Sequence, residues 1–343
     1  MSSPPLISVV VPVFRNAPTL LPTFEGVLAV RDQNFPDLDF EMVLVDDGSD
    51  DDSWQAMQGL YAAYPAHVRL LKLSRNFGQV SAILAGCEAA RGDAVVTLSA
   101  DLQDPPGLIA QMVACWREGS EVVIAHREAR DDDVAATLFS RLAYGIARRA
   151  NPRIPRGGFD YLLLSHRAAR LLLSFKGRHR FFQGDVLWLG FPTTFLPYVR
   201  QKRPVGRSGW SFAKKFKYFT DLLLDSSYFP IRLMSCLGFV TAIAGLVYAL
   251  VIVFAWFHNE TPFPGYAPIM ITQLIVGGLI MMMLGVVGEY LWRIYDDVKQ
   301  RPLYIVEKAV ISDTSLAHAP LADVRVAGSL SADQNAPAAN TSQ

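Results

Sequence analysis

A short segment of this chain combines the pattern of a buried strand with side chains that bind metal ions. The apolar run at 95–98 leads into the sequence SADLQD at 99–104, and two prolines follow. In an α/β domain such a segment lies at the carboxyl end of a parallel strand, where ligands bind. The oxygen atoms of Asp101 and Gln103 at a strand end suit Mg²⁺ or Mn²⁺ that carries a diphosphate. The alternative is a structural segment in which Asp104 caps the following helix.

These side chains need a sheet that holds them in place, and the first 125 residues predict one. Short β-branched runs alternate with longer helical stretches, which is typical of a parallel sheet covered by helices on both faces. We therefore predict an α/β fold with a mostly parallel sheet. The predicted strands are 7–13, 40–45, 68–73, 94–98 and 121–125, and the predicted helices are 19–30, 53–64, 79–90 and 106–117.

The pattern between residues 127 and 198 is less regular. A helix is predicted over 134–150, and a loop is predicted over 151–158, which is rich in proline, glycine and arginine. Two short apolar runs, 186–189 and 194–196, predict a hairpin at the far edge of the sheet.

Two long apolar runs predict membrane-spanning helices. The runs at 231–257 and 269–292 both exceed the roughly 20 apolar residues that cross a bilayer core. The connecting segment 258–268 contains no lysine or arginine, whereas both flanks are rich in them. The positive-inside rule therefore places both flanks in the cytosol. Residues 1–5 lack the basic and apolar regions of a signal peptide, so we predict that none is present and that the bulk of the protein stays cytosolic.

The segment 210–229 joins the two halves and shows a helical pattern. Its apolar side chains recur at helical spacing, and its lysines lie largely off that face. Aromatic side chains on one side and lysines on the other are typical of a helix in the membrane interface. A helix packed on the amino-terminal domain is the alternative. The apolar face contains Phe212, Phe216, Phe219 and Leu223, and the lysines are Lys214, Lys215 and Lys217.

These patterns divide the chain into four parts. They are an α/β domain (1–209), an interfacial helix (210–229), a two-helix membrane region (230–295), and a cytosolic segment (296–343) that ends in a disordered tail. The formal net charge of 0 gives no electrostatic support for binding nucleic acid. The three cysteines lack metal-binding or redox spacing, which indicates a reducing compartment.

Several motifs occur in the order that is found in one enzyme family. They are VVVPVFRN at 9–16, VDDGS at 45–49, NFGQVSAI at 76–83 and SADLQDPP at 99–106, followed by GEYLWRIY at 288–295 and RPLY at 301–304. Together with the two apolar helices, these motifs resemble the family 2 glycosyltransferases of GT-A fold, whose sheet is Rossmann-like. The resemblance covers residues 6 to 308 and is greatest to bacterial polyprenyl-phosphate glycosyltransferases, the relatives of dolichyl-phosphate mannose synthase.

The resemblance implies a site for a nucleotide-sugar, held through its base, ribose and diphosphate. Pro12 would lie under the base, and Asp46 or Asp47 would accept a hydrogen bond from the base or ribose. A turn that caps a helix is the structural alternative for the two aspartates. Asp101 would bind Mg²⁺ or Mn²⁺, with Gln103 as a neutral second ligand, and the metal would stabilise the departing diphosphate. The implied donor-binding residues are Pro12, Asp46, Asp47, Asn76, Gly78, Gln79, Ser99 and Asp101.

The sequence departs from the family pattern at two places. Most relatives carry two aspartates in the metal motif, and here Ser99 replaces the first, which removes one negative charge. Many relatives place an aspartate after a glycine in the loop that faces the acceptor. Here Gly158 occupies that position, and Asp160 follows two residues later. Asp101 and Asp160 are the predicted catalytic residues, and whether Asp160 replaces the missing aspartate stays open.

The resemblance also implies a lipid phosphate as the acceptor. The second pKa of a phosphomonoester is about 6, so this acceptor is largely a dianion in the cytosol and needs no general base. It needs positioning, and the arginine fork matches phosphate oxygens. RPVGRS at 203–208 resembles the Arg-x-x-Gly-x-Ser element of the family. The candidates are Arg127, Arg130, Arg200, Arg203, Arg207 and Ser208, and contact with solvent or lipid headgroups is the alternative for each arginine.

We therefore predict an inverting glycosyltransferase at the cytosolic face of the inner membrane. It would move one sugar from a nucleotide-sugar to undecaprenyl phosphate or a similar carrier; the base of the donor stays open, with uridine favoured over guanosine. One alternative is a glycosyltransferase with another lipid or polymer acceptor, although the sequence lacks the Gln-x-x-Arg-Trp element of processive synthases. Another is an inactive membrane scaffold or flippase partner. The sequence does not disclose the sugar, and it leaves open whether the protein forms a homo-oligomer.

Overall fold

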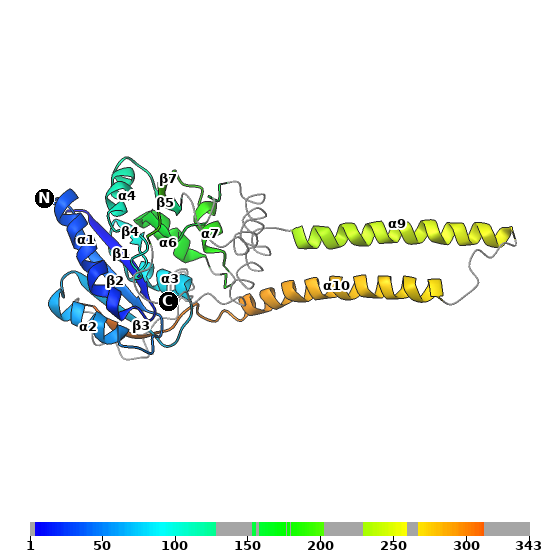
Figure 1. Ribbon diagram of the computed structural model, residues 1–343, viewed down its shortest axis with the longest axis horizontal. Coiled ribbons are helices and arrows are strands. Elements are labelled where there is room, and N and C mark those ends of the chain that lie inside the picture. The colour runs from blue at the N-terminus through cyan, green and yellow to red at the C-terminus, as the bar shows by residue number, and fades with distance from the viewer. Residues whose placement is uncertain are drawn as a thin grey trace, which may run out of the picture. The chain divides into compact units, whose positions relative to one another are not determined.

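The chain folds into two compact units (Figure 1). The first contains Met1–Trp210 and Gln300–Gln343, and the second is Ser211–Lys299. The first unit therefore combines residues from both ends of the sequence. The computed structural model describes residues 4–127, 153–155, 158–175, 177–178, 180–201, 229–258 and 267–311.

A mixed sheet forms the centre of the first unit. Its described strands lie in the order β7-β5-β6-β4-β1-β2-β3-β8. Strands β1 to β5 and β7 run in one direction, and β6 and β8 run in the other. The five strands predicted from the sequence are thus present and mutually parallel. The strands are β1 Leu6–Val13, β2 Asp39–Asp46, β3 Val68–Leu73, β4 Ala94–Thr97, β5 Val122–Arg127, β6 Tyr161–Ser165, β7 Thr193–Tyr198 and β8 Val306–Val310.

Helices cover both faces of this sheet, as the alternation of apolar runs predicts. Side chains of β1 alternate between the two layers: Val9 and Val11 join the apolar cluster formed with α1, α2 and α4, whereas Val10 lies against Gly86 of α3. A Cβ atom at Gly86 would lie 2.3 Å from Val10 Cγ1, so the glycine lets α3 approach the sheet closely. This arrangement confirms the predicted α/β fold. The helical elements are η1 Ala17–Thr19, α1 Leu20–Asn34, α2 Ser53–Ala63, α3 Gln79–Ala89, α4 Leu108–Arg117, α6 His166–Ser174 and α7 Phe182–Trp188.

The sheet contains features that the sequence analysis did not predict. The hairpin predicted from 186–189 and 194–196 is wrong, because the first run lies in helix α7 and β7 pairs in parallel with β5. A four-residue apolar run does not distinguish a strand from a turn of buried helix. Strands β6 and β8 were not predicted either, and both are antiparallel to their neighbours.

The second unit contains two long helices, α9 (Phe229–Phe257) and α10 (Ala267–Val298). They coincide with the two apolar runs of the sequence, so the predicted helices are confirmed. Within the described ranges, one helical stretch, Ile275–Val298, is long and apolar enough to cross a membrane, and α9 contains the shorter apolar stretch Leu233–Tyr248. The crossing of a membrane by both helices stays a prediction.

Some expectations lie outside the described residues. The helix predicted over 134–150 is one of them, and so is the tail beyond 311. The structure describes only parts of the loop at 151–158, and only Phe229 of the interfacial helix predicted over 210–229.

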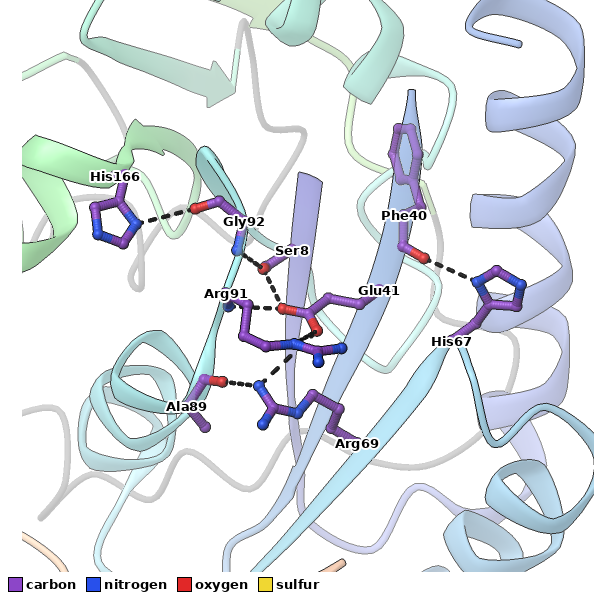
Figure 2. Close-up of polar contacts among 9 residues, drawn as sticks. All are labelled: Ser8, Phe40, Glu41, His67, Arg69, Ala89, Arg91, Gly92 and His166. Carbon is purple, nitrogen blue, oxygen red and sulfur yellow. Dashed lines mark hydrogen bonds and ion pairs between the residues drawn. The ribbon is translucent and has the colours of Figure 1, made fainter. Parts of the chain in front are cut away.

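A buried ion cluster ties together β1, β2, β3 and the segment after α3, and Figure 2 shows its side chains converging on Glu41. Glu41 is 2% exposed. Its Oε1 accepts hydrogen bonds from Ser8 Oγ (2.6 Å) and from the backbone N–H of Arg91 (2.7 Å), and its Oε2 accepts one from Arg91 Nε (3.1 Å). Arg69 Nη1 lies 3.9 Å from Oε2 and also donates to the carbonyl of Ala89. The cluster lies toward the amino-terminal ends of the strands, away from the edge where ligands bind in this fold class.

Replacing Glu41 with alanine is expected to lower the free energy of unfolding by about 3–5 kcal/mol, because it leaves a buried arginine without its counter-charge. Arg69 is only 5% exposed, so water cannot replace the lost carboxylate fully. Urea-induced unfolding in detergent, followed by circular dichroism, measures the change. Glu25→Ala is the matched control, because Glu25 is exposed on α1. Similar losses in both variants would contradict the prediction.

Candidate functional site

Two acidic segments lie at the same edge of the sheet. Strand β1 lies between β2 and β4, and all three are parallel, so the segments that follow β2 and β4 leave the sheet on either side of β1. The backbone N–H of Asp47 donates to the carbonyl of Val13 (2.8 Å). Thr19 Oγ1, in the segment after β1, donates to the carbonyl of Ala100 (2.5 Å). The carboxyl ends of these strands therefore form one edge of the kind that binds ligands in α/β sheets.

Asp46 carries a buried carboxylate oxygen without a hydrogen-bond partner. The residue is 0% exposed, and its Oδ1 accepts a hydrogen bond from the backbone N–H of Ser49 (2.9 Å). Its Oδ2 is buried and unpaired. Because an unpaired buried oxygen costs free energy, such an atom indicates a site for a ligand's donor group or an ordered water. In the β1–β2 register Val13 is opposite Asp46, and Pro12, one residue earlier, is opposite Val45.

Asp47, by contrast, uses both carboxylate oxygens to hold the loop at 75–78, here called the donor loop. Oδ1 accepts the backbone N–H of Phe77 (2.7 Å), and Oδ2 accepts that of Gly78 (2.9 Å). Burial raises the pKa of Asp47, although the two backbone hydrogen bonds lower it. Gly48 has a φ of +69°, and a Cβ atom there would lie 2.4 Å from the backbone of Arg75, so glycine is required at this close approach.

The interpretation of Asp46 and Asp47 as a helix-capping turn is wrong. Helix α2 begins at Ser53, and the residue before it is Asp52. Asn76 and Gly78 lie in the donor loop, and Gln79 is the first residue of α3. The structure therefore brings the predicted donor-binding residues of these two motifs together.

Asp47→Asn is expected to lower the free energy of unfolding by about 1–3 kcal/mol, because an amide can accept from only one of the two backbone N–H groups. The measurement is urea-induced unfolding, with amide hydrogen exchange at Phe77 and Gly78 as a local readout. Asp52→Asn serves as the control, since Asp52 is exposed and its side chain does not cap α2. If Asp47→Asn and Asp52→Asn behave alike, the carboxylate does not hold the loop.

The segment after β4 forms a compact acidic turn. Ser99 Oγ donates to Asp101 Oδ1 (2.6 Å), and the backbone N–H of Gln103 donates to the same oxygen (3.1 Å). Leu102, between them, has a φ of +59°, in the left-handed region. Asp101 is 7% exposed. The turn therefore holds the Asp101 carboxylate in a fixed orientation.

Asp104 does not cap helix α4. That helix begins at Leu108 after Gly107, and no side chain caps it. Asp104 Oδ1 instead accepts a hydrogen bond from the Tyr198 hydroxyl (2.6 Å). Burial raises the pKa of Asp104, while Tyr198 and two nearby arginines lower it. Tyr198 ends the edge strand β7 and has no motif around it, so it could not be predicted from the sequence.

The two nearby arginines, Arg127 and Arg200, each have a buried Nε atom without a hydrogen-bond partner. Arg127 Nη2 lies 3.7 Å from Asp160 Oδ2. Burial and the charge of Arg127 lower the pKa of Arg200, whereas Asp104 and Asp101 raise it. Two guanidinium groups that repel one another and keep unpaired donors are suited to bind an anion.

The segment after β7 contacts the acidic turn directly. The backbone N–H of Gln201 donates to the carbonyl of Gln103 (2.9 Å), and Gln103 Nε2 donates to the carbonyl of Gln201 (3.3 Å). This pairing holds Arg200 near Asp101. The remaining predicted acceptor-site residues, Arg130, Arg203, Arg207 and Ser208, lie outside the described residues.

The acidic turn after β4 is the candidate metal site among the described residues. Within them, no group of three or more histidine, cysteine, aspartate and glutamate side chains is placed to hold a metal ion. The oxygen atoms of Asp101, Gln103 and Ser99 nevertheless occur together in one turn. Mg²⁺ often takes only one or two carboxylates and completes its shell with water and substrate phosphates, and this donor set fits that pattern.

Residues 8–170 match the family described as Glycosyl transferase family 2. The chain is 34% identical over 307 residues to the uncharacterized glycosyltransferase YkcC of Bacillus subtilis, which covers 88% of this chain and 93% of that protein. It is 32% identical over 314 residues to the SfII prophage-derived bactoprenol glucosyl transferase of Shigella flexneri, which covers 88% and 98%.

A similarity to a solved structure was also found. This is glucosyl-3-phosphoglycerate synthase from Mycobacterium tuberculosis in complex with Mn²⁺ and uridine-diphosphate-glucose. The two chains are 18% identical, with a TM-score of 0.45, and the match covers 63% of this chain and 76% of that one.

Proposed function

The chain belongs to glycosyl transferase family 2, and we propose that it transfers one sugar from a nucleotide-sugar to a polyprenyl phosphate. The family resemblance seen in the motifs is thereby confirmed, and the chain is a glycosyltransferase. The observation that supports a polyprenyl phosphate as the acceptor is the 32% identity to a bactoprenol glucosyl transferase over 98% of that protein's length. The match extends well beyond the family domain at 8–170, so it includes the carboxyl-terminal half of the chain.

Asp46 is the residue that we propose to bind the nucleotide. Its unpaired Oδ2 is suited to accept a hydrogen bond from an N–H of the base or an O–H of the ribose. Both Asp47 oxygens, by contrast, already accept a hydrogen bond from the donor loop. We therefore assign it to shaping the site, together with Asn76, Gly78 and Gln79. Pro12 provides the apolar surface under the base.

Asp101 and Gln103 are the residues that we propose to hold a divalent cation, with Ser99 orienting the Asp101 carboxylate. Mg²⁺ or Mn²⁺ bound there would offset the charge on the departing nucleotide diphosphate. The single carboxylate of this turn suits a cation that takes most of its remaining ligands from the diphosphate and from water.

Arg127 and Arg200 are proposed to position the acceptor phosphate, together with Arg130, Arg203, Arg207 and Ser208. The unpaired Nε atoms of the first two offer donors to phosphate oxygens. A phosphate oxyanion attacks the anomeric carbon and forms the new C–O bond, while the bond to the nucleotide diphosphate breaks on the opposite face. Since the nucleophile is already ionised, no base is needed. We assign Asp160 to orienting Arg127, from which its carboxylate lies 3.7 Å away.

A membrane location follows from the lipid acceptor. We propose that α9 and α10 both cross the inner membrane, with residues 210–229 at its interface and the sugar-transferring domain in the cytosol. The lysine- and arginine-rich flanks of the two helices support this orientation. A homo-oligomer is compatible with the proposal.

The test is transfer of radiolabel from nucleotide-sugars, beginning with UDP-glucose, by the purified full chain in detergent with Mg²⁺ or Mn²⁺. We expect label on undecaprenyl phosphate and none on undecaprenol, which lacks the ready-made anion. Equal transfer to both lipids would overturn the argument that no base is needed. Transfer to another lipid or polymer alone would overturn the acceptor, and failure with every nucleotide-sugar would favour an inactive scaffold.

A further inference from the structure

The chain returns to the sheet after its long apolar helices. Residues 301–311, here called the return segment, follow α10 and begin with the motif RPLY, to which the proposed function assigns no role. Strand β8 within this segment pairs antiparallel with the edge strand β3, with Val306 opposite Leu73 and Val310 opposite Leu70. An edge strand gains a ladder of backbone hydrogen bonds in this way. The return segment is therefore an integral part of the first unit.

The return segment contacts the chain on both sides of the donor loop. On one side, the backbone N–H of Ser74, next to Arg75, donates to the carbonyl of Ile305 (3.0 Å). On the other side, the Tyr304 hydroxyl donates to the carboxylate of Glu88 on α3, the helix that begins directly after the loop. Burial and the bond to Glu88 raise the pKa of Tyr304, so its hydroxyl keeps its proton throughout the neutral range.

The donor loop is held from within by Arg75, whose Nη1 donates to the carbonyl of Asn76 (3.2 Å) and whose guanidinium lies 4.1 Å from the centre of the Phe77 ring. It is held from the β2 side by the Asp47 carboxylate, through the N–H groups of Phe77 and Gly78. Gly78 has a φ of +101°, and the loop also packs closely on Gly48. A shift of β3 or α3 would therefore move the backbone that Asp47 binds, next to the unpaired oxygen of Asp46.

We propose that the return segment sets the geometry of the nucleotide site, with Tyr304 and Glu88 as positioning residues that act through the donor loop. This inference rests on the proposed function, since it takes a nucleoside diphosphate as the ligand. The return segment ties the strand before the donor loop to the helix after it, and the loop carries that constraint to Asp46 and Asp47. By thermodynamic reciprocity, a nucleotide that orders the donor loop also stabilises the return segment.

The first experiment measures UDP affinity by titration calorimetry on the full chain in detergent with Mg²⁺. Tyr304→Phe removes one hydrogen bond and keeps the ring, and we expect it to weaken UDP binding by about 3-fold to 10-fold. Glu88→Ala, which removes the acceptor, should have a similar effect, and the double variant should lose no more than either single one. Tyr64→Phe is the matched control, because Tyr64 is 39% exposed and contacts Phe24 through its ring. Unchanged UDP affinity in Tyr304→Phe would overturn the proposal.

A second measurement separates this inference from the proposed function. Hydrogen exchange without nucleotide should be faster at Phe77 and Gly78 in Tyr304→Phe than in Tyr64→Phe, and UDP should slow exchange across 306–310 in the unmodified chain. Equal exchange at the donor loop in both variants overturns the positioning role, whatever the chain binds. If the unmodified chain binds no nucleotide, the proposed function fails, and the donor-loop exchange still decides whether the return segment holds the loop.

Discussion

Replacing Asp101 with asparagine is expected to lower kcat by about 100-fold to 1,000-fold, the range that follows from removing one group that stabilises transition-state charge. Ser99 occupies the position where a second aspartate would stand, so the turn offers no substitute carboxylate at that position. Asparagine keeps the acceptor oxygen that Ser99 and Gln103 bind, so the turn should retain its shape. The decrease in kcat can then be attributed to the loss of the negative charge of Asp101.

The measurement is turnover at saturating donor and acceptor across a range of Mg²⁺ and Mn²⁺ concentrations, together with the melting temperature. We expect the metal concentration for half-maximal activity to rise and the melting temperature to stay within the error of the unmodified chain. Asp32→Asn, an exposed substitution on α1, is the control. Turnover near that of the unmodified chain would remove Asp101 from the site.

Asp46→Asn is expected to weaken donor binding by about 10-fold to 100-fold, with a smaller effect on kcat at saturating donor. An asparagine has one acceptor oxygen, whereas Asp46 has two, one that accepts the N–H of Ser49 and one, unpaired, that we propose accepts from the nucleotide. Whichever way the amide is turned, its NH₂ group faces a hydrogen-bond donor, either the N–H of Ser49 or the donor group of the nucleotide. The change is isosteric, so the apolar packing around this buried residue is preserved.

Titration with UDP, alongside the donor KM, separates this effect from that of Asp101→Asn, because one variant loses affinity and the other loses turnover. Asp39→Asn is the control, since Asp39 begins the same strand and is exposed. If Asp46→Asn bound UDP as tightly as Asp39→Asn, the unpaired oxygen would be a water site and not a nucleotide contact.

Much of the fold could be predicted because its central strands are buried on both faces. Strands such as β1 and β2 are short, nearly continuous apolar runs separated by helices, and this pattern specifies a parallel sheet. Strands β6 and β8 lack that context, because they join the sheet from irregular or distant parts of the chain. Helix α7 was misread because its apolar run is too short to show a period.

The sequence motifs predicted which residues form the candidate site, but they did not predict the hydrogen bonds that each side chain makes. The sequence placed Asp46 and Asp47 together but left open which of them accepts a ligand's hydrogen bond. Only the structure shows that both carboxylate oxygens of Asp47 accept hydrogen bonds from the loop after β3, whereas one carboxylate oxygen of Asp46 has no hydrogen-bond partner. Tyr198 was missed because its partner, Asp104, is 94 residues away in the sequence and no local pattern links them.

The reversed direction of β6 has a consequence for engineering this protein. Because β6 runs antiparallel to β5 and pairs with it, the end of β5 at Arg127 and the start of β6 at Tyr161 lie at the same edge of the sheet. A segment that begins and ends at the same edge of a sheet can be exchanged between homologues without changing the backbone hydrogen bonds between the two strands that flank it. Exchanging that stretch with the one from a relative would therefore leave the pairs from Val122–Leu164 to Ala125–Tyr161 in place.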